Sequence, residues 1–283
     1  MRIDFWKMHG IGNDFIMLDD RDKTIAGYID YSDLAVRLCH RRFGIGADGI
    51  ILARHSDTHD IRFIIINSDG SEPEMCGNGM RCFAKYLYEN NILVKDEIKV
   101  QTLAGTVVPR IEKKQSGQVV SVCVDMGVPR LVPQQIPFVH DRDMALGVPI
   151  ETAQGTMFVS CVSMGNPHAV IFVNDLSLVD IETIGPMVEN HPRFPEKTNV
   201  EFIEVVSDRQ LKMRVWERGA GITLACGTGA CAAVTAAHLT GRAGRQVRVN
   251  LDGGDLDISW NESSGHIFKT GPAQTVFKGT FDI

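Results

Sequence analysis

The sequence predicts an α/β protein built from two similar halves, and three observations lead to this prediction. Strand-length apolar runs alternate with a few helical stretches along the chain. The length of 283 residues suits two domains of about 140 residues each better than a single domain. A cysteine loop rich in glycine occurs twice, and other features recur at nearly the same separation.

The strands and helices follow from local composition. Five runs rich in valine, isoleucine and phenylalanine are bounded by glycine, aspartate, asparagine or proline, which predicts strands. These runs are 62–67, 118–124, 157–163, 169–173 and 211–216. Helices are expected at 31–41, 77–89, 180–189 and 227–239. The second has an apolar stripe at helical spacing, and the fourth is small or apolar almost all round, which is typical of a wholly buried helix.

The domain boundaries are expected near a proline-containing segment, 129–137, which is the best candidate for a crossing between domains. We expect an N-terminal domain of residues 1–126 plus 272–283. The C-terminal domain is expected to hold residues 127–271. No long linker or low-complexity segment interrupts either one.

Composition and charge exclude several classes of function. Hydrophobic residues make up 44% of the chain, and the formal net charge is −6. Because no run of lysine and arginine stands out, we expect no nucleic-acid partner and no anionic membrane surface. No stretch approaches the roughly 20 apolar residues of a membrane span, and the N-terminus is too charged for a signal peptide. The expected location is therefore the cytoplasm, where the seven cysteines would be free thiols.

The repeated loop is the most informative feature. Cys-Gly-Asn-Gly at 76–79 recurs as Cys-Gly-Thr-Gly at 226–229. Nine residues before each cysteine stands a polar residue that closes a strand, Asn67 in one half and Glu217 in the other.

Two further features accompany the repeat. Each loop is followed by a second cysteine, Cys82 or Cys231, which we interpret as helix packing. A Gly-Asn pair before an apolar strand occurs at 12–13 and again at 165–166. Together these features predict two copies of one fold, each with a strand, a glycine-bearing loop, a cysteine and a helix.

This arrangement suits proton transfer at a carbon atom. The first turn of a helix leaves N–H groups unpaired and carries a partial positive charge, which lowers the pKa of a thiol and attracts a carboxylate. Two such helix ends facing each other would hold a carboxylate with one sulfur on each side of its α-carbon. Cys76 and Cys226 could then remove a proton from one face and return one to the other. We find no metal-ligand spacing and no sign of a pyridoxal phosphate site, so we expect neither a metal nor a cofactor.

The motifs resemble those of the diaminopimelate epimerase family over essentially the whole chain. They lie at 7–15, 43–49, 67–71, 75–82, 165–168, 198–200, 216–219 and 225–229. The resemblance implies two pseudo-symmetric domains, each a curled, mostly antiparallel sheet around a central helix, with the active site in the interdomain cleft. It also implies a cofactor-independent homodimer that interconverts LL- and meso-diaminopimelate, in the synthesis of lysine and peptidoglycan.

The resemblance also assigns residues. Cys76 and Cys226 would be the acid–base thiols, and His168 would lie near them. The other expected contacts are the N–H groups of Gly77, Asn78, Gly227 and Thr228 for the reacting carboxylate, Asn67 and Glu217 for the reacting ammonium, and Asn13, Asn166, Asn199 and Arg218 for the distal end. Some family members have a glutamine at the position of Gly49, so this position is left out of the site.

Several alternatives remain open at this point. A related two-thiol proline or hydroxyproline racemase would carry other residues before its second cysteine. A non-catalytic amino-acid-binding protein would have no use for two opposed thiols. Acyl transfer by a cysteine would need an oriented histidine. Zinc ligation by the paired cysteines is disfavoured by their spacing.

Overall fold

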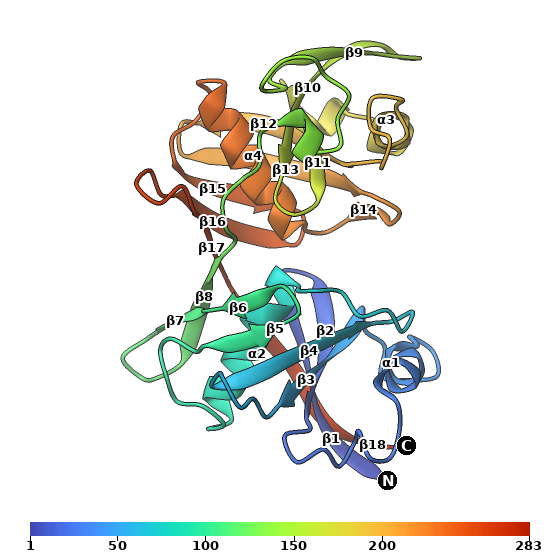
Figure 1. The fold of residues 1–283 in the computed structure, drawn as a ribbon, viewed down its shortest axis with the longest axis vertical. Helices are drawn as coiled ribbons and strands as arrows, with labels where there is room; N and C mark the ends of the chain where they lie inside the picture. Colours follow the sequence, from blue (N-terminus) through green and yellow to red (C-terminus); the bar gives the residue numbers. More distant parts are fainter. The chain divides into compact units, whose positions relative to one another are not determined.

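The structure, a computed structural model, describes all of residues 1–283 and divides the chain into two compact units (Figure 1). The first unit holds Met1–Asp125 with Thr270–Ile283, and the second holds Met126–Lys269. The proline-containing segment 129–137 lies within the second unit, where Arg130 forms a β-bridge with Ser163. The predicted α/β class with two similar halves is confirmed.

The first unit combines two helices with a mixed sheet. Its helices are α1 (Tyr31–Cys39) and α2 (Gly77–Glu89). Its strands are β1 (Arg2–Gly10), β2 (Asn13–Asp19), β3 (Gly49–Arg54), β4 (Ile61–Asn67), β5 (Val100–Thr102), β6 (Gly105–Val107), β7 (Arg110–Lys113), β8 (Val119–Asp125) and β18 (Gln274–Asp282). The sheet order is β18-β1-β2-β3-β4-β5-β6, with β2–β3 and β4–β5 parallel and the other pairs antiparallel.

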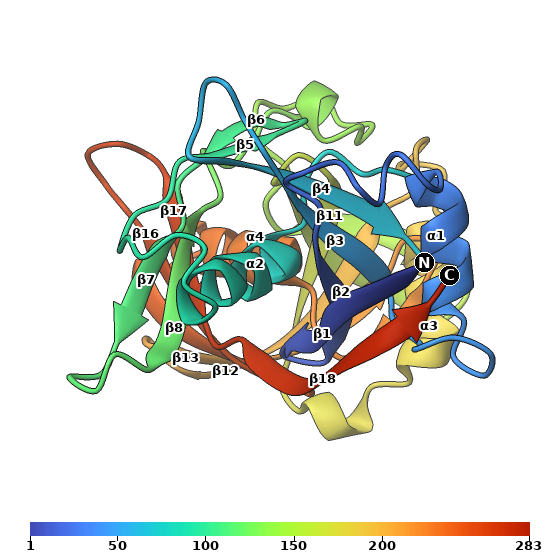
Figure 2. The same ribbon diagram turned by 90° about the horizontal axis from the view of Figure 1, so that it is seen from below.

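Helix α2 is enclosed by the strands of this unit. It packs on β1, β2 and β3 and on the antiparallel β7–β8 hairpin, while α1 packs on β3 and β4 (Figure 2). The two ends of the chain lie side by side, and the Met1 amino group donates to the Ile283 carbonyl oxygen at 2.7 Å.

The second unit repeats this plan. Its helices are α3 (Ile181–Glu189) and α4 (Gly227–Leu239), with short 3₁₀ turns η1 (Pro133–Gln135) and η2 (Leu176–Leu178). Its strands are β9 (Val148–Thr152), β10 (Gly155–Ser163), β11 (Pro167–Val173), β12 (Asn199–Ser207), β13 (Gln210–Glu217), β14 (Gly221–Thr223), β15 (Gln246–Leu251), β16 (Gly254–Trp260) and β17 (Ile267–Gly271). Helix α4 packs on β10, β11, β12 and β16, and α3 packs on β12, β13 and β14.

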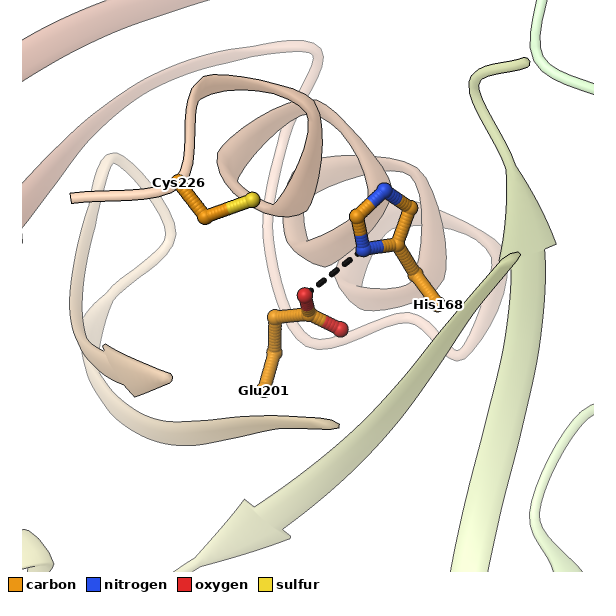
Figure 3. A group of neighbouring side chains, drawn as sticks. All are labelled: His168, Glu201 and Cys226. Carbon is orange, nitrogen blue, oxygen red and sulfur yellow. Dashed lines mark hydrogen bonds and ion pairs between the residues drawn. The ribbon is translucent and has the colours of Figure 1, made fainter. Parts of the chain in front are cut away.

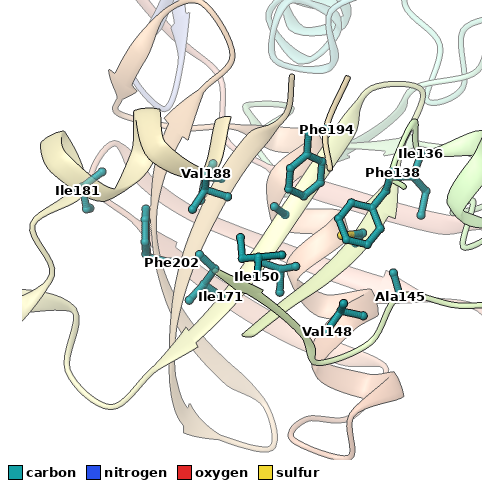
Figure 4. Packing of buried hydrophobic residues seen from close by; sticks show 14 of the residues in the cluster. Ile136, Phe138, Ala145, Val148, Ile150, Ile171, Ile181, Val188, Phe194 and Phe202 are labelled. Atoms are coloured by element: carbon teal, nitrogen blue, oxygen red, sulfur yellow. The ribbon is translucent and has the colours of Figure 1, made fainter. Parts of the chain in front are cut away.

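The central strands β3, β4, β11 and β12 are buried on both faces over most of their length, which explains their continuous apolar runs. In β12, Val200 and Phe202 join the cluster beneath α3 that also contains Ile181 and Val188 (Figure 4). In β3, Ile50 and Leu52 lie in the corresponding cluster beneath α1.

Strand register shows how the two halves correspond. Phe15 on β2 pairs with Gly49 on the parallel strand β3. His168 on β11 pairs in the same way with Asn199 on the parallel strand β12. The second cysteines are not equivalent, because Cys231 is the fifth residue of α4 whereas Cys82 is the sixth of α2. Both are fully buried, as expected for helix packing.

Candidate active site

Each expected catalytic thiol caps the N-terminus of a buried helix. Cys76 is the N-cap of α2, and its sulfur accepts from the Gly79 N–H at 3.3 Å. Cys226 is the N-cap of α4, and its sulfur accepts from the Gly229 N–H at 3.4 Å. These thiols occupy the place that serine or aspartate oxygens usually take at an N-cap.

The residues between each thiol and its capping glycine have a distinct role. Gly77 and Asn78 in α2, and Gly227 and Thr228 in α4, are the first two residues of their helices. Their N–H groups have no acceptor within the helix. Each helix therefore offers two donors beside a sulfur, which suits a carboxylate.

Asn13 lies beside the first thiol and is held from behind. Its amide nitrogen donates to Asp48 Oδ2 at 2.6 Å. Its side-chain oxygen Oδ1 thereby faces the Cys76 sulfur at 3.8 Å and the side-chain nitrogen Nδ2 of Asn78 at 3.4 Å. The buried Arg81 fixes Asn78 in turn, since Arg81 Nη1 donates to Asn78 Oδ1 at 2.9 Å.

Asp48 belongs to a charged cluster that fixes this corner of the first unit. Arg41 bridges the Asp48 and Asp14 carboxylates at 2.7 and 2.9 Å. Lys7 pairs with Asp14 at 2.6 Å. Hydrogen bonds and charge from Arg41 and Lys7 outweigh burial and hold the pKa of Asp14 below its ordinary value.

Asn67 closes β4, as the sequence predicted. Its amide nitrogen donates to the Ser71 hydroxyl at 2.9 Å, and its N–H donates to the Ser71 carbonyl oxygen at 2.8 Å. Asn67 pairs with Gly49 on β3. A side chain at Gly49 would place its Cβ 2.6 Å from the Ile66 carbonyl oxygen, so this backbone has no room for a side chain at this position.

In the second unit, a chain of hydrogen bonds runs from His168 to the thiol. His168 Nε2 lies 3.0 Å from Asn166 Oδ1, and the Asn166 amide nitrogen donates to the Thr228 hydroxyl at 3.4 Å. The same hydroxyl lies 3.4 Å from the Cys226 sulfur. The structure thus brings Asn166, His168 and Thr228 together with Cys226.

The remaining expected contacts gather at the end of β13. The buried Asn199 accepts from the Arg218 N–H at 3.0 Å and donates to the Pro167 carbonyl oxygen at 2.8 Å. Glu217 accepts a hydrogen bond from the Thr223 hydroxyl. Among the hydrogen bonds described, the Arg218 guanidinium donates one, to the Glu196 carbonyl oxygen at 3.1 Å.

The expected lowering of the thiol pKa is wrong for Cys226. Burial raises the pKa of this thiol well above its ordinary value, and the charges of Glu217 and Glu201 raise it further. Hydrogen bonds from Thr228 and Gly229 act in the opposite direction but are smaller. The helix end favours a thiolate, but the loss of water around the sulfur outweighs that field.

Glu201 is the residue that sequence reasoning missed in this half. It is fully buried on β12, and its Oε1 accepts from His168 Nδ1 at 2.7 Å (Figure 3). The available signal was a carboxylate inside an apolar strand of sequence Val-Glu-Phe-Ile. In the first half, sequence reasoning also missed Asp48, a partly buried residue directly before β3.

One group of side chains could in principle hold a metal ion. The ligand atoms of His168, Glu201 and Cys226 lie within 4.8 Å of one another, and all three residues are buried. Two of these atoms already form a hydrogen bond, so a metal would have to replace the contact between His168 and Glu201.

No helix of the structure has the length and apolar character that crossing a membrane requires.

Sequence comparisons identify close relatives of the whole chain. A family model described as diaminopimelate epimerase matches residues 5–132 and 160–276. The chain is 53% identical to the diaminopimelate epimerase of Desulforapulum autotrophicum over 283 residues, covering all of both chains. It is 51% identical to the diaminopimelate epimerase of Heliobacterium modesticaldum, over 99% of this chain and all of the relative.

Solved structures share the fold at much lower identity. A phenazine biosynthesis protein of the PhzF family from Bacillus anthracis superposes with a TM-score of 0.72 at 14% identity, covering all of both chains. A probable proline racemase from Agrobacterium radiobacter has a TM-score of 0.68 at 19% identity, covering 99% of this chain and 92% of that one. At these identities the likeness is one of fold.

Proposed function

The chain belongs to the diaminopimelate epimerase family, and from this membership we propose that it interconverts LL- and meso-diaminopimelate with Cys76 and Cys226 as its two acid–base thiols. The observation that carries the assignment of the thiols is the repeated helix N-terminus. In each half, a cysteine caps a buried helix, and two N–H groups of the same first turn stand beside it.

The proposed reaction uses one helix end from each half. The substrate carboxylate binds the N–H groups of Gly77, Asn78, Gly227 and Thr228. A thiolate removes the α-proton, and the electron pair of the C–H bond enters the carboxylate to give an enediolate-like species. The opposite thiol then gives its proton to the other face of the α-carbon, so that one proton is taken up and one is returned. Donors aimed at the carboxylate oxygens stabilise the charge that develops there.

The other polar groups orient the substrate. Asn67 and Glu217 receive the reacting ammonium, whose positive charge offsets the partial burial of the Glu217 carboxylate. Asn13, Asn166, Asn199 and Arg218 bind the distal amino-acid end. The Arg218 guanidinium suits its carboxylate because a planar fork can donate two parallel hydrogen bonds.

Family membership favours the epimerase over the related racemases, whose likeness to this chain lies in the fold.

The sheet of the first unit has β18 as an edge strand, where Val276 and Phe277 are exposed. We propose that a second copy covers this strand in a homodimer. The reaction needs reduced thiols, and the seven cysteines are free, which supports a cytoplasmic location.

Solvent deuterium tests the proposed function directly. The purified chain is incubated with LL-diaminopimelate in D₂O, and the α-proton is followed by NMR while the isomers are separated chromatographically. We expect exchange of the α-proton together with conversion to the meso isomer, before and after dialysis against EDTA. A protein that only binds amino acids would give neither, and proline offered in parallel should remain unchanged.

A further inference from the structure

A buried acid–base pair lies beneath the second thiol. Glu201 and His168 are both fully buried and face α4 from neighbouring strands (Figure 3). The Glu201 Oε2 atom is buried and has no hydrogen-bond partner. A buried carboxylate costs free energy unless its surroundings compensate for the lost water. The pair therefore calls for an explanation beyond packing.

The first half of the molecule shows that the fold does not need this pair. By strand register, Phe15 and Ile51 occupy the positions of His168 and Glu201. The contacts with the helices agree with this correspondence. A Cβ added to Gly79 would lie 2.7 Å from Ile51 Cδ1, and one added to Gly229 would lie 2.6 Å from Glu201 Oε1. The same site beneath the helix is thus apolar under Cys76 and ionisable under Cys226.

The pair is connected to the thiol by side-chain hydrogen bonds. Glu201 contacts Nδ1 of the His168 ring, and Nε2 of the ring lies against the side-chain oxygen Oδ1 of Asn166. Asn166 donates to Thr228, whose hydroxyl lies against the Cys226 sulfur. Glu201 is therefore the anchor of a network that ends at the reacting atom.

The titratable groups around Cys226 come from three strands. Glu201 faces it from β12, His168 from β11 and Glu217 from the end of β13. The two carboxylates both raise the pKa of the thiol, in the same direction as burial. A substrate ammonium would offset the charge of Glu217, whereas Glu201 lies below the helix and keeps its effect.

We propose that Glu201 is a positioning residue for the second thiol, which fixes His168 and Asn166 against the first turn of α4 and keeps Cys226 protonated before substrate binds. This inference rests on the proposed function, because it makes Cys226 the proton donor in a turnover that begins at a Cys76 thiolate. In that turnover the α-proton passes to the Cys76 sulfur. The Cys226 proton then passes to the opposite face of the α-carbon, leaving Cys226 as the thiolate.

The test compares two matched substitutions on one strand. Glu201→Gln removes the charge but keeps the shape and an oxygen that accepts from His168. Glu204→Gln removes a carboxylate from β12 that bonds instead to the exposed Lys212, and it serves as the control. Alkylation of Cys226 by iodoacetamide is measured from pH 6 to 11 by peptide mass spectrometry, because the rate follows the fraction of thiolate.

We expect the alkylation midpoint of Cys226 to move to lower pH in Glu201→Gln, with a rate at pH 8 about tenfold higher than in the unmutated chain. Glu204→Gln should leave the midpoint unchanged. The pH profile of kcat/KM should shift with the alkylation midpoint in Glu201→Gln, which a purely structural role would not produce. Coincident Cys226 profiles in the unmutated and Glu201→Gln chains would overturn the proposal.

Two features keep the test decisive. If Glu201→Gln does not fold, the alkylation of the unmutated chain still tests the proposal. An alkylation midpoint of Cys226 at or below the pH midpoint of free cysteine would contradict a thiol that is held in the protonated form. Alkylation also needs no turnover. A shifted profile in a chain that does not epimerise diaminopimelate would therefore reject the proposed function while supporting the role of Glu201.

Discussion

Cys76 and Cys226 have different surroundings although both cap a helix. Cys226 is almost completely buried and has Glu201 and Glu217 nearby, whereas Cys76 is half-buried and lies against the side-chain oxygen Oδ1 of Asn13. A thiol in either place can exchange a proton only if its sulfur can carry a charge during the reaction. The hydroxyl of serine is a far weaker acid, so it can fill the same space without doing the same work.

Substituting either thiol should therefore remove activity without unfolding the protein. We expect Cys76→Ser and Cys226→Ser each to lower kcat/KM for epimerisation by at least about 100-fold, since acid–base groups contribute roughly 10²–10⁴-fold. Cys123→Ser, on β8, is the control and should retain activity. Initial rates with LL- and meso-diaminopimelate measure the effect. Near-normal turnover in either thiol variant would contradict the two-base mechanism.

Helices α2 and α4 share a constraint that their sequences alone do not explain. Each has glycine at its third position, although alanine is the better helix former. The reason lies in the strand beneath, because a Cβ at Gly79 would contact Ile51 and one at Gly229 would contact Glu201. The N–H of the same glycine donates to the capping sulfur in each helix.

The constraint in α4 gives a stability prediction. Gly229→Ala should lower the free energy of unfolding by about 1–3 kcal/mol through overpacking, although helix propensity alone would raise it by up to about 1 kcal/mol. Urea unfolding measures the change. In a double-mutant cycle with Glu201→Ala, the smaller side chain should make room for the new methyl group. The double variant should therefore lose less than the sum of the single losses, and strict additivity would show that the contact does not limit this position.

Across the whole molecule, buried thiols link stability to alkaline pH. Burial raises the pKa of Cys39 and of Cys82 to about 12, and it raises the pKa of Cys161 and of Cys226 further from its ordinary value. In the unfolded chain, thiols ionise near pH 8.5. Above that pH the unfolded state holds fewer protons than the folded state, so the free energy of unfolding falls as pH rises.

The expected loss is roughly 1.4 kcal/mol per pH unit for each of these thiols, between about pH 9 and the folded-state values. Urea unfolding at pH 7, 8, 9 and 10 measures it, and these thiols should contribute no slope below pH 8. Cys161→Ala should have a lower free energy of unfolding at pH 7. Above pH 9, its free energy of unfolding should fall less steeply with pH, by the contribution of one thiol. A free energy of unfolding that stays constant from pH 8 to 10 would contradict the burial of these groups.

The sequence by itself determined the features that depend on neighbouring residues. Helices expected at 77–89 and 227–239 are α2 and α4, because the apolar stripe of the first and the small, apolar composition of the second are local properties. The repeat predicted two similar units, and the motifs indicated the family that the comparisons show. Asn67 and Glu217 were correctly placed at strand ends because a polar residue after an apolar run is visible in the sequence.

Only the tertiary structure decided the features that depend on strand pairing and burial. Glu201 meets His168 across 33 positions of the chain, through the parallel register of β11 and β12. Asp48 meets Asn13 in the same way across 35 positions. The helix end at Cys226 predicted a lowered thiol pKa, but packing removed the water and set a carboxylate below the sulfur, which raised it. A local field can be inferred from neighbouring residues, whereas desolvation is known only when the surrounding elements are in place.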